Sequence, residues 1–378
     1  MKPLLPGSRL GMLGGGQLGR MSILAGRALG YRFTVLEPKT GSSAGMVADE
    51  QIAAAYDDPV GLRRLAGSVD RVTLEFENIP SRSLEILGET VAVFPGKKAL
   101  ETCQNRAREK RFLKESGIPC APFEVVASRE AFGEALDRIG RPAVLKTADF
   151  GYDGKGQVKV DATTDLDAAW GAYEGHSAVL EKWIPFEGEY AILCGRNAGG
   201  RSCVYPVIRN IHRDHILHLS VSPAGLEESL EEEARDIALT IADGLDLVGL
   251  IAVELFLTSS GWLVNEMAPR PHNSGHLTLD THRTSQFEQH IRLVCGLAPG
   301  STVQHTAGCM LNLLGDLWEN GDPDWAGILD DPHCKLHLYD KGEPRRGRKM
   351  GHLTFLGDEA EACRERALRL DEHLRNGR

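Results

Sequence analysis

The sequence contains no apolar run near the roughly 20 residues that a helix needs to cross a bilayer, and Met1 to Pro6 lack the apolar core of a secretory signal. Its eight cysteines are scattered and include no Cys-x-x-Cys pair, which favours reduced thiols over a disulfide framework. With a net charge of −10, the chain lacks the positive charge that attracts nucleic acids and anionic membranes. These absences predict a cytosolic (cytoplasmic) protein that binds neither nucleic acid nor membrane.

The 378 residues are enough for two or three domains, and a hydrophobic content of 42% can fill their cores. Strand-like and helix-like segments alternate over residues 1–105, which predicts a parallel sheet covered by helices. In the first helix of this region Met21, Ile23, Leu24, Ala28 and Leu29 approximate an apolar stripe. The beginning of the chain is therefore expected to be an α/β domain.

The remainder predicts further units. A charged helix from Arg106 to Glu115 is interpreted as a connector, and residues 120–187 have strand patterns of their own, as in a small separate lobe. Residues 188–298 predict strands with one helix, Glu227 to Leu245. The tail from residue 299 predicts short strands and a final polar helix, Glu359 to Arg375.

The first glycine loop, Gly14-x-Gly16-x-x-Gly19, lies between a predicted strand and a predicted helix, and Glu37 ends the next strand. This is the context of a dinucleotide-binding fingerprint, in which glycines allow close backbone approach and the helix N-terminus faces a phosphate. An NAD site, a site for another phosphate, and a turn that only lets helix and strand pack closely remain alternatives at this stage.

A second glycine loop, Gly151 to Gln157, follows a strand that ends in Lys146. Backbone amides of such a loop can close over phosphates, with lysines as compact positive charges. It is no Walker A loop, because nowhere in the chain does Ser or Thr follow a Gly-Lys pair. A hairpin turn with solvated lysines is the structural alternative.

Two acidic residues face each other in a predicted hairpin. Thr258 to Gly261 joins two apolar strands, and a turn centred near residues 259–260 brings Glu254 almost opposite Glu266. Like charges that face each other in an apolar ladder require neutralisation, and carboxylates beside Asn265 suit Mg²⁺. A solvent-facing edge with both acids hydrated is the alternative.

Cations and amides follow the acidic hairpin directly, in the segment from Arg270 to His276, and could hold an anion beside a metal-bound phosphate. A metal site at His272 and His276 and a plain structural loop are the alternatives there. A second cationic segment, Lys341 to His352, is either a solvated face or part of a site. It contains no aromatic residue between its cations, which argues against a nucleic-acid surface.

Taken in order, six motifs resemble the ATP-grasp superfamily, and within it the N5-carboxyaminoimidazole ribonucleotide synthetase family. They are Met12 to Arg20, Glu75-Phe76-Glu77-Asn78, Gly151 to Gln157, Asn265-Glu266, Arg270 to His276, and Gly347 to His352. The resemblance covers nearly the whole chain. It implies an α/β (α+β) ATP-grasp fold: a Rossmann-like domain at 1–105, an ATP-grasp domain at 106–298 with a mobile lid at about 120–187, and a small C-terminal domain at 299–378, in a homodimer.

The resemblance also implies the site. Its ATP-binding positions are Arg106, Lys146, Gly151, Tyr152, Asp153, Gly154, Lys155, Gly156, Gln157, Glu181, Lys182, Trp183, Ile184, Glu189, His212, Asn265 and Glu266. The magnesium ligands are Glu254 and Glu266, and bicarbonate or carboxyphosphate corresponds to Arg270, His272 and Asn273. The ribonucleotide corresponds to Gly16, Gln17, Leu18, Glu75, Glu77, Tyr152, Lys155, Lys341 and Arg348, with the bicarbonate residues beside it. The catalytic positions are Asp153, which orients or deprotonates the amine, Lys341, Arg270 and His272.

The implied reaction consumes ATP, bicarbonate and 5-aminoimidazole ribonucleotide in purine biosynthesis, through carboxyphosphate, with functional coupling to a downstream mutase. The chain departs from the family pattern at Arg346, where a proline is common, and at Phe150, where a small residue is frequent. An NAD-dependent oxidoreductase, another ATP-grasp ligase and a non-catalytic nucleotide sensor are the rival interpretations. The oxidoreductase interpretation leaves the second glycine loop and the acidic pair unexplained.

Overall fold

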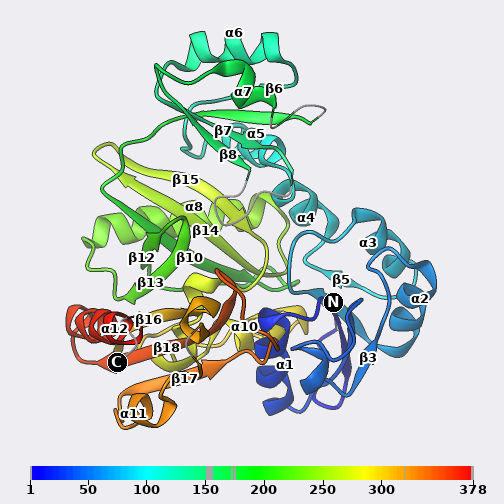
Figure 1. Cartoon of the computed structure of the whole chain (residues 1–378). Coiled ribbons are helices and arrows are strands. Elements are labelled where there is room, and N and C mark those ends of the chain that lie inside the picture. The colour runs from blue at the N-terminus through cyan, green and yellow to red at the C-terminus, as the bar shows by residue number, and fades with distance from the viewer. Residues whose placement is uncertain (1, 150–155, 172, 174–175, 320, 376–378) are drawn as a thin grey trace.

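The computed structural model describes residues 2–149, 156–171, 173, 176–319 and 321–375, which form three β-sheets with helices packed on them (Figure 1). Within these residues, no helix combines the length and the apolar character needed to cross a membrane. All eight cysteines are free thiols, as predicted.

The N-terminal sheet is parallel, in the order β3-β2-β1-β4-β5, and helices alternate with its strands as predicted. Its elements are β1 (Arg9–Leu13), α1 (Gln17–Ala28), β2 (Arg32–Leu36), η1 (Gly45–Val47), β3 (Glu50–Ile52), α2 (Pro59–Ser68), β4 (Arg71–Leu74), α3 (Ser81–Gly88), β5 (Val93–Phe94) and α4 (Lys97–Cys103). Helix α1 begins within the first glycine loop, at Gln17, and Gly14 ahead of it has a φ of +110°, which a side chain would disfavour.

The predicted separate lobe is a four-stranded antiparallel sheet in the order β6-β9-β7-β8, at the top of Figure 1. It comprises β6 (Phe123–Val126), α6 (Arg129–Ile139), β7 (Ala143–Thr147), β8 (Gln157–Val160), α7 (Leu166–Gly171) and β9 (Ala178–Lys182), and α5 (Arg106–Glu115) leads into it. Ser128 caps α6 by accepting a hydrogen bond from the Ala131 amide. Phe132, Trp170 and Tyr173 stack in the lobe's own core.

The third sheet has nine antiparallel strands and runs from β15 at one edge to β17 at the other. Its central part holds β10 (Gly188–Arg196), β11 (Ser202–Val204), β12 (Ile208–Arg213), β13 (Ile216–Ser222), α8 (Glu228–Gly244), β14 (Gly249–Thr258), β15 (Gly261–Ala268), η2 (Asn273–Gly275), α9 (Thr278–Thr281) and α10 (Gln286–Val294). The tail adds β16 (Ala307–Leu314), η3 (Gly315–Trp318), α11 (Trp325–Leu329), β17 (Cys334–Leu338), β18 (Lys349–Gly357) and α12 (Ala360–Arg375). Because β16 pairs with β13, the tail extends the central sheet, and the boundary at residue 299 stays a prediction.

Two details of the prediction are wrong. Residues 188–298 hold α10 and the short α9 besides the predicted helix, and α10 packs against α1. Its polar residues Gln286, Gln289 and His290 are buried together with its apolar face. In α1, Leu24 is 47% exposed and Ala28 is exposed too, so neither belongs to the buried stripe.

Candidate functional site

The acidic hairpin forms as predicted. Strands β14 and β15 pair from Thr258, opposite Gly261, to Ala252, opposite Ala268, and Glu254 lies opposite Glu266. The register shifts between Glu254 and Leu255, which marks a β-bulge. The two carboxylates therefore lie together on an otherwise apolar pair of strands.

The electrostatics of this pair call for a cation. Burial, followed by the charge of Glu266, raises the pKa of Glu254 to about 8. His272 lies 3.4 Å from the Glu254 carboxylate through its Nε2. The amide nitrogen of Asn265 donates to the Glu254 carboxylate at 3.5 Å, and its amide oxygen is buried and has no hydrogen-bond partner. Two carboxylates and a free amide oxygen are a hard-oxygen donor set that fits Mg²⁺.

Cations from two other elements gather around Glu181, and one more reaches the acidic pair. On β9 Glu181 accepts a hydrogen bond from Lys146 on β7, at 3.1 Å, and forms an ion pair with Lys110 on α5, at 3.4 Å. Burial alone would raise the pKa of Glu181, but the charges of Lys110 and Lys146 lower it to about 2. Arg106, at the start of α5, approaches Glu266 at 3.3 Å. The structure thus brings the predicted Arg106, Lys146, Glu181 and Glu266 together.

Another predicted pair lies on neighbouring strands. The His212 ring, through Nδ1, hydrogen-bonds the Glu189 carboxylate between β12 and β10. Burial opposes protonation of His212, but the hydrogen bond and the charge of Glu189 outweigh it and raise its pKa. Glu189 lies on β10, which also pairs with β14, where Ala191 faces Glu254. The two residues are therefore near the acidic hairpin.

The first glycine loop already has an anionic partner. The backbone amides of Gly16 and Gly19 donate hydrogen bonds to Glu75, the latter at 2.8 Å from N to Oε2. Burial raises the pKa of Glu75, although the hydrogen bonds from the two amides and the charge of Lys341 act to lower it. A carboxylate thus takes the helix N-terminal position where we expected a phosphate, and with Gly16 engaged in this way, phosphate binding by Gly16, Gln17 and Leu18 stays a prediction.

The segment after the hairpin reaches the N-terminal domain. Arg270 forms a two-point ion pair with Glu77, with 3.0 Å between Nη2 and Oε1. Although burial alone would raise it, Arg270 lowers the pKa of Glu77. His272 caps the short helix η2, and the amide group of Asn273, the first residue of that helix, is buried with neither of its polar atoms hydrogen-bonded. These groups fit an anion or a small polar ligand.

The tail also contacts the N-terminal domain. Ser43 donates a hydrogen bond to the Tyr339 carbonyl, and Arg20 lies 3.6 Å from Asp340. Since the charge of Lys341 acts on Glu75, that lysine lies near the glycine loop. Arg348 donates to the Glu343 carbonyl at 3.0 Å, and among the described residues no contact links it to the acidic hairpin.

Part of the predicted site lies outside the described residues: Gly151, Tyr152, Asp153, Gly154 and Lys155, with Phe150. Gly156 and Gln157 are described at the start of β8, and Tyr173 donates a hydrogen bond to the Gly156 carbonyl at 3.1 Å. Strand β9 ends at Lys182, and Trp183 and Ile184 come directly after it. Of these, Trp183 is exposed, with the Lys159 ammonium 4.4 Å from its ring centre.

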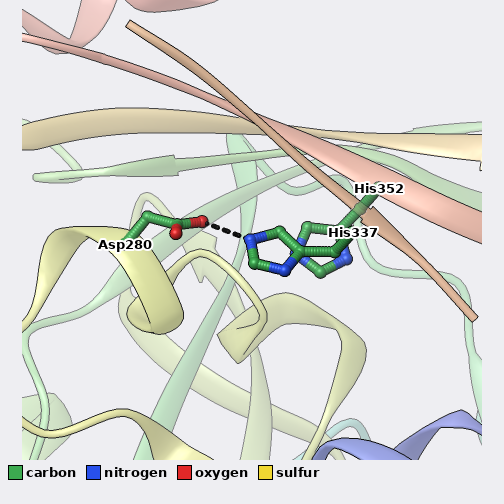
Figure 2. A group of neighbouring side chains, drawn as sticks. All are labelled: Asp280, His337 and His352. Atoms are coloured by element: carbon green, nitrogen blue, oxygen red, sulfur yellow. Dashed lines mark hydrogen bonds and ion pairs between the residues drawn. The ribbon is translucent and has the colours of Figure 1, made fainter. Parts of the chain in front are cut away.

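A separate cluster joins α9 to the tail. His337 hydrogen-bonds Asp280 at 2.8 Å and stacks on His352, with 4.5 Å between ring centres and 16° between planes (Figure 2). The ligand atoms of these three residues lie within 4.8 Å of one another. However, nearly parallel rings direct their in-plane lone pairs side by side and not at one point. We therefore interpret the cluster as a structural contact.

Sequence reasoning missed Glu109 and Lys110. Both are buried on α5, and Glu109 accepts a hydrogen bond from the Met267 amide at 2.9 Å. Burial raises the pKa of Glu109 to about 7. The missed signal was spacing: Arg106, Glu109 and Lys110 are three and four residues apart and so share one face of the helix.

Known protein families cover most of the chain. The family described as ribonucleotide synthetase preATP-grasp domain matches residues 8–104, and the ATP-grasp domain matches residues 111–287. The phosphoribosylaminoimidazole carboxylase C-terminal domain matches residues 308–366. The ATP-grasp architecture predicted from the six motifs is confirmed.

Individual proteins agree with these matches. The N5-carboxyaminoimidazole ribonucleotide synthase of Bacillus subtilis is 41% identical over 358 residues, covering 93% of this chain and 92% of the relative. A crystal structure of an N5-carboxyaminoimidazole ribonucleotide synthetase–ADP complex has a TM-score of 0.94 at 42% identity, covering 100% of this chain and 99% of the other. The Aspergillus clavatus synthase bound to ADP and 5-aminoimidazole ribonucleotide has a TM-score of 0.89 at 27% identity, covering 98% and 99%. This chain therefore belongs to the N5-carboxyaminoimidazole ribonucleotide synthase family of ATP-grasp ligases.

Proposed function

We propose that this chain uses ATP and bicarbonate to carboxylate 5-aminoimidazole ribonucleotide to N5-carboxyaminoimidazole ribonucleotide, releasing ADP and phosphate, in purine (IMP) biosynthesis. The observation that carries the proposal is the opposition of Glu254 and Glu266 beside Arg106, with Lys146 paired to Glu181 on the adjoining lobe. Acids that need a cation lie next to cations that suit phosphates, which is the arrangement required to bind a metal–nucleotide complex. The names of the relatives supply the ribonucleotide.

Glu254, Glu266 and the unpartnered Asn265 oxygen would hold Mg²⁺. When bound, this ion would neutralise charge on the nucleotide phosphates. Lys146 is the phosphate-binding cation on the lobe. We assign the nucleotide also to Glu181 to Ile184, to Glu189 with His212, and to the second glycine loop, Gly151 to Gln157.

The first chemical step makes a better electrophile from bicarbonate. A bicarbonate oxygen attacks the γ-phosphorus of ATP, and the bond to ADP breaks, leaving carboxyphosphate. Arg270 and the free amide of Asn273 would orient the anion, with His272 beside them. Glu77 fixes the guanidinium of Arg270 from the N-terminal domain. Orientation is the main contribution of these residues.

In the second step the exocyclic amine of the ribonucleotide attacks the carboxyl carbon of carboxyphosphate, or CO₂ released from it, and phosphate leaves. The amine proton passes to phosphate or to Asp153, which we assign to orienting the amine. Lys341, Glu75 and the glycine loop would hold the ribonucleotide, since the charge of Lys341 acts at that loop. Arg348 stays a prediction for its phosphate.

We also propose, from the resemblance and from the free cysteines, that the enzyme is a cytoplasmic homodimer that works with a downstream mutase. Light scattering of the purified chain tests the dimer. A monomer at micromolar concentration would contradict it.

The experiment that tests the function measures ADP release with both co-substrates, without the ribonucleotide, and without bicarbonate. We expect ADP release and carboxylated product to require all three substrates. Turnover that needs another acceptor would indicate a different ATP-grasp ligase. ADP release that is indifferent to both co-substrates would overturn the proposal.

A further inference from the structure

Helix α5 holds the backbone of β15 on both sides of Glu266. Lys110 donates a hydrogen bond from Nζ to the Asn265 carbonyl at 2.8 Å. Glu109 accepts one from the Met267 amide at 2.9 Å. The residue before Glu266 and the residue after it are therefore both fixed by adjacent side chains of one helix. Arg106, from the same face, approaches the Glu266 carboxylate itself.

The strand needs this support because it is bulged at this point. Glu254 pairs with Glu266, but Leu255 pairs with Val264, so Asn265 is the extra residue of the bulge. Bulges re-aim side chains and disrupt the ladder of hydrogen bonds. Strand β15 is also the edge of its sheet, so its outward backbone groups need partners from elsewhere.

The side chains that supply these hydrogen bonds are costly to bury. Lys110 is fully buried and Glu109 is 3% exposed. Burying two charged groups is costly unless each is well paired, and water or a neutral side chain could satisfy an edge strand at lower cost. Charged groups do, however, make stronger and more directional hydrogen bonds to a backbone than neutral ones. Their use here indicates a requirement for a fixed position.

Lys110 also links two parts of the site. Its ammonium lies 3.4 Å from the Glu181 carboxylate on β9 of the lobe. The backbone amide of Arg106 donates to the Ala148 carbonyl, next to β7, at 2.8 Å. The helix that fixes Glu266 is therefore attached to the lobe that carries Lys146 and Glu181.

We propose that Lys110 and Glu109 are positioning residues for metal–nucleotide binding. They hold the bulge that directs Glu266 towards Glu254. Through its ion pair, Lys110 also fixes the position of Glu181 relative to these two acids. The inference rests on the proposed function only in that it takes Glu254 and Glu266 as the metal ligands.

The test compares Lys110→Met with Lys114→Met, a matched change at an exposed position of the same helix. Calorimetry measures the affinity of the full chain for ADP at a series of Mg²⁺ concentrations. We expect Lys110→Met to raise the Mg²⁺ concentration needed for half-maximal ADP affinity by about 10- to 100-fold, as for other residues that support metal ligands. We expect Lys114→Met to behave as the wild type, and the KM for the ribonucleotide to stay unchanged in both variants.

Glu109 provides an independent comparison. Glu109→Gln keeps an oxygen that can accept from the Met267 amide and should change the Mg²⁺ dependence less than Glu109→Leu, which keeps none. A role in folding alone would lower the melting temperature of Glu109→Leu and Lys110→Met without changing the Mg²⁺ dependence of folded protein. That result in either variant would overturn the proposal. Wild-type protein that binds Mg²⁺ and ADP but shows no ribonucleotide-dependent turnover would instead overturn the proposed function alone.

Discussion

The Glu75 carboxylate accepts a hydrogen bond from the Gly19 amide at 2.8 Å, and a second one from Gly16, at the start of α1. A side chain of the protein therefore fills the position that dinucleotide-binding proteins reserve for a phosphate. The loop holds Glu75, the residue directly after β4, in place, and the charge of Lys341 on the tail acts on its carboxylate. The proposed ribonucleotide site therefore combines residues of the N-terminal domain with a residue of the tail.

Gly16→Val tests that assignment. A Cβ at Gly16 would lie 2.7 Å from the Glu75 Oε1, so the carboxylate must move. We expect a KM for the ribonucleotide raised at least tenfold, with the KM for ATP nearly unchanged, if the displaced interaction is a hydrogen bond to a charged group of about 1.5–3 kcal/mol. Steady-state kinetics with each substrate varied in turn provide the measurement. Measurable NAD binding by the wild type, without ribonucleotide binding, would support the dehydrogenase interpretation instead.

The acidic hairpin was predictable because its signals are local. Thr258 to Gly261 fixes the turn, and the register that follows from it would place Glu254 opposite Asn265, next to Glu266. The bulge shifts the pairing by one residue and brings Glu266 opposite Glu254. The bulge at Asn265 was not predictable, because it depends on Lys110 and Glu109, which arrive from a distant helix. The same limit explains why α5 was interpreted as a connector.

Contacts between segments far apart in the sequence also explain which features of the fold could not be predicted. Helix α10 buries His290 against Thr73 of β4, with 2.7 Å between Nε2 and Oγ1, so a polar side chain occupies a core position. Pairing of β16 with β13 makes the tail part of the central sheet, although the local patterns predicted only short strands. The resemblance supplied the family, but contacts between distant segments supplied the geometry.

Glu266→Gln tests the metal assignment. The change removes the charge that raises the pKa of Glu254 and also the ion pair of Glu266 with Arg106, and these two effects on stability oppose each other. In the presence of a chelator the variant should therefore melt at nearly the same temperature as the wild type. Its affinity for ADP should respond to Mg²⁺ at least tenfold more weakly, because Mg²⁺ prefers charged oxygen ligands. Thermal melting and calorimetry give both quantities. Unchanged magnesium dependence would refute the assignment.

Asp153→Asn and Lys341→Ala test the ribonucleotide half of the site. We expect both variants to bind ATP normally and to lose carboxylated product by about a hundredfold or more, the usual contribution of a positioned acid–base group. The two residues lie far apart in sequence, so a shared phenotype indicates a shared site. ATP binding and product formation are measured on the same samples. Full product formation by either variant would show that the site is wrongly assigned.

His290 predicts an acid-sensitive fold. Burial lowers its pKa from 6.5 to about 4, so below pH 6.5 the unfolded chain binds the proton more readily than the folded chain. The stabilisation is complete above that pH and is lost as the pH falls towards 4, by up to about 3 kcal/mol. Urea unfolding between pH 7 and pH 4 measures it. His290→Gln, which cannot take up the proton, should show a shallower loss, and an equal loss would contradict the assignment.

The most direct test of the proposed reaction uses bicarbonate labelled with ¹⁸O. If bicarbonate attacks the γ-phosphorus of ATP, one of its oxygens bridges carbon and phosphorus and leaves with phosphate when the amine attacks. Mass spectrometry of the phosphate formed with ATP and 5-aminoimidazole ribonucleotide measures the transfer. We predict one labelled oxygen in each phosphate released. Unlabelled phosphate, formed alongside carboxylated product, would contradict the account.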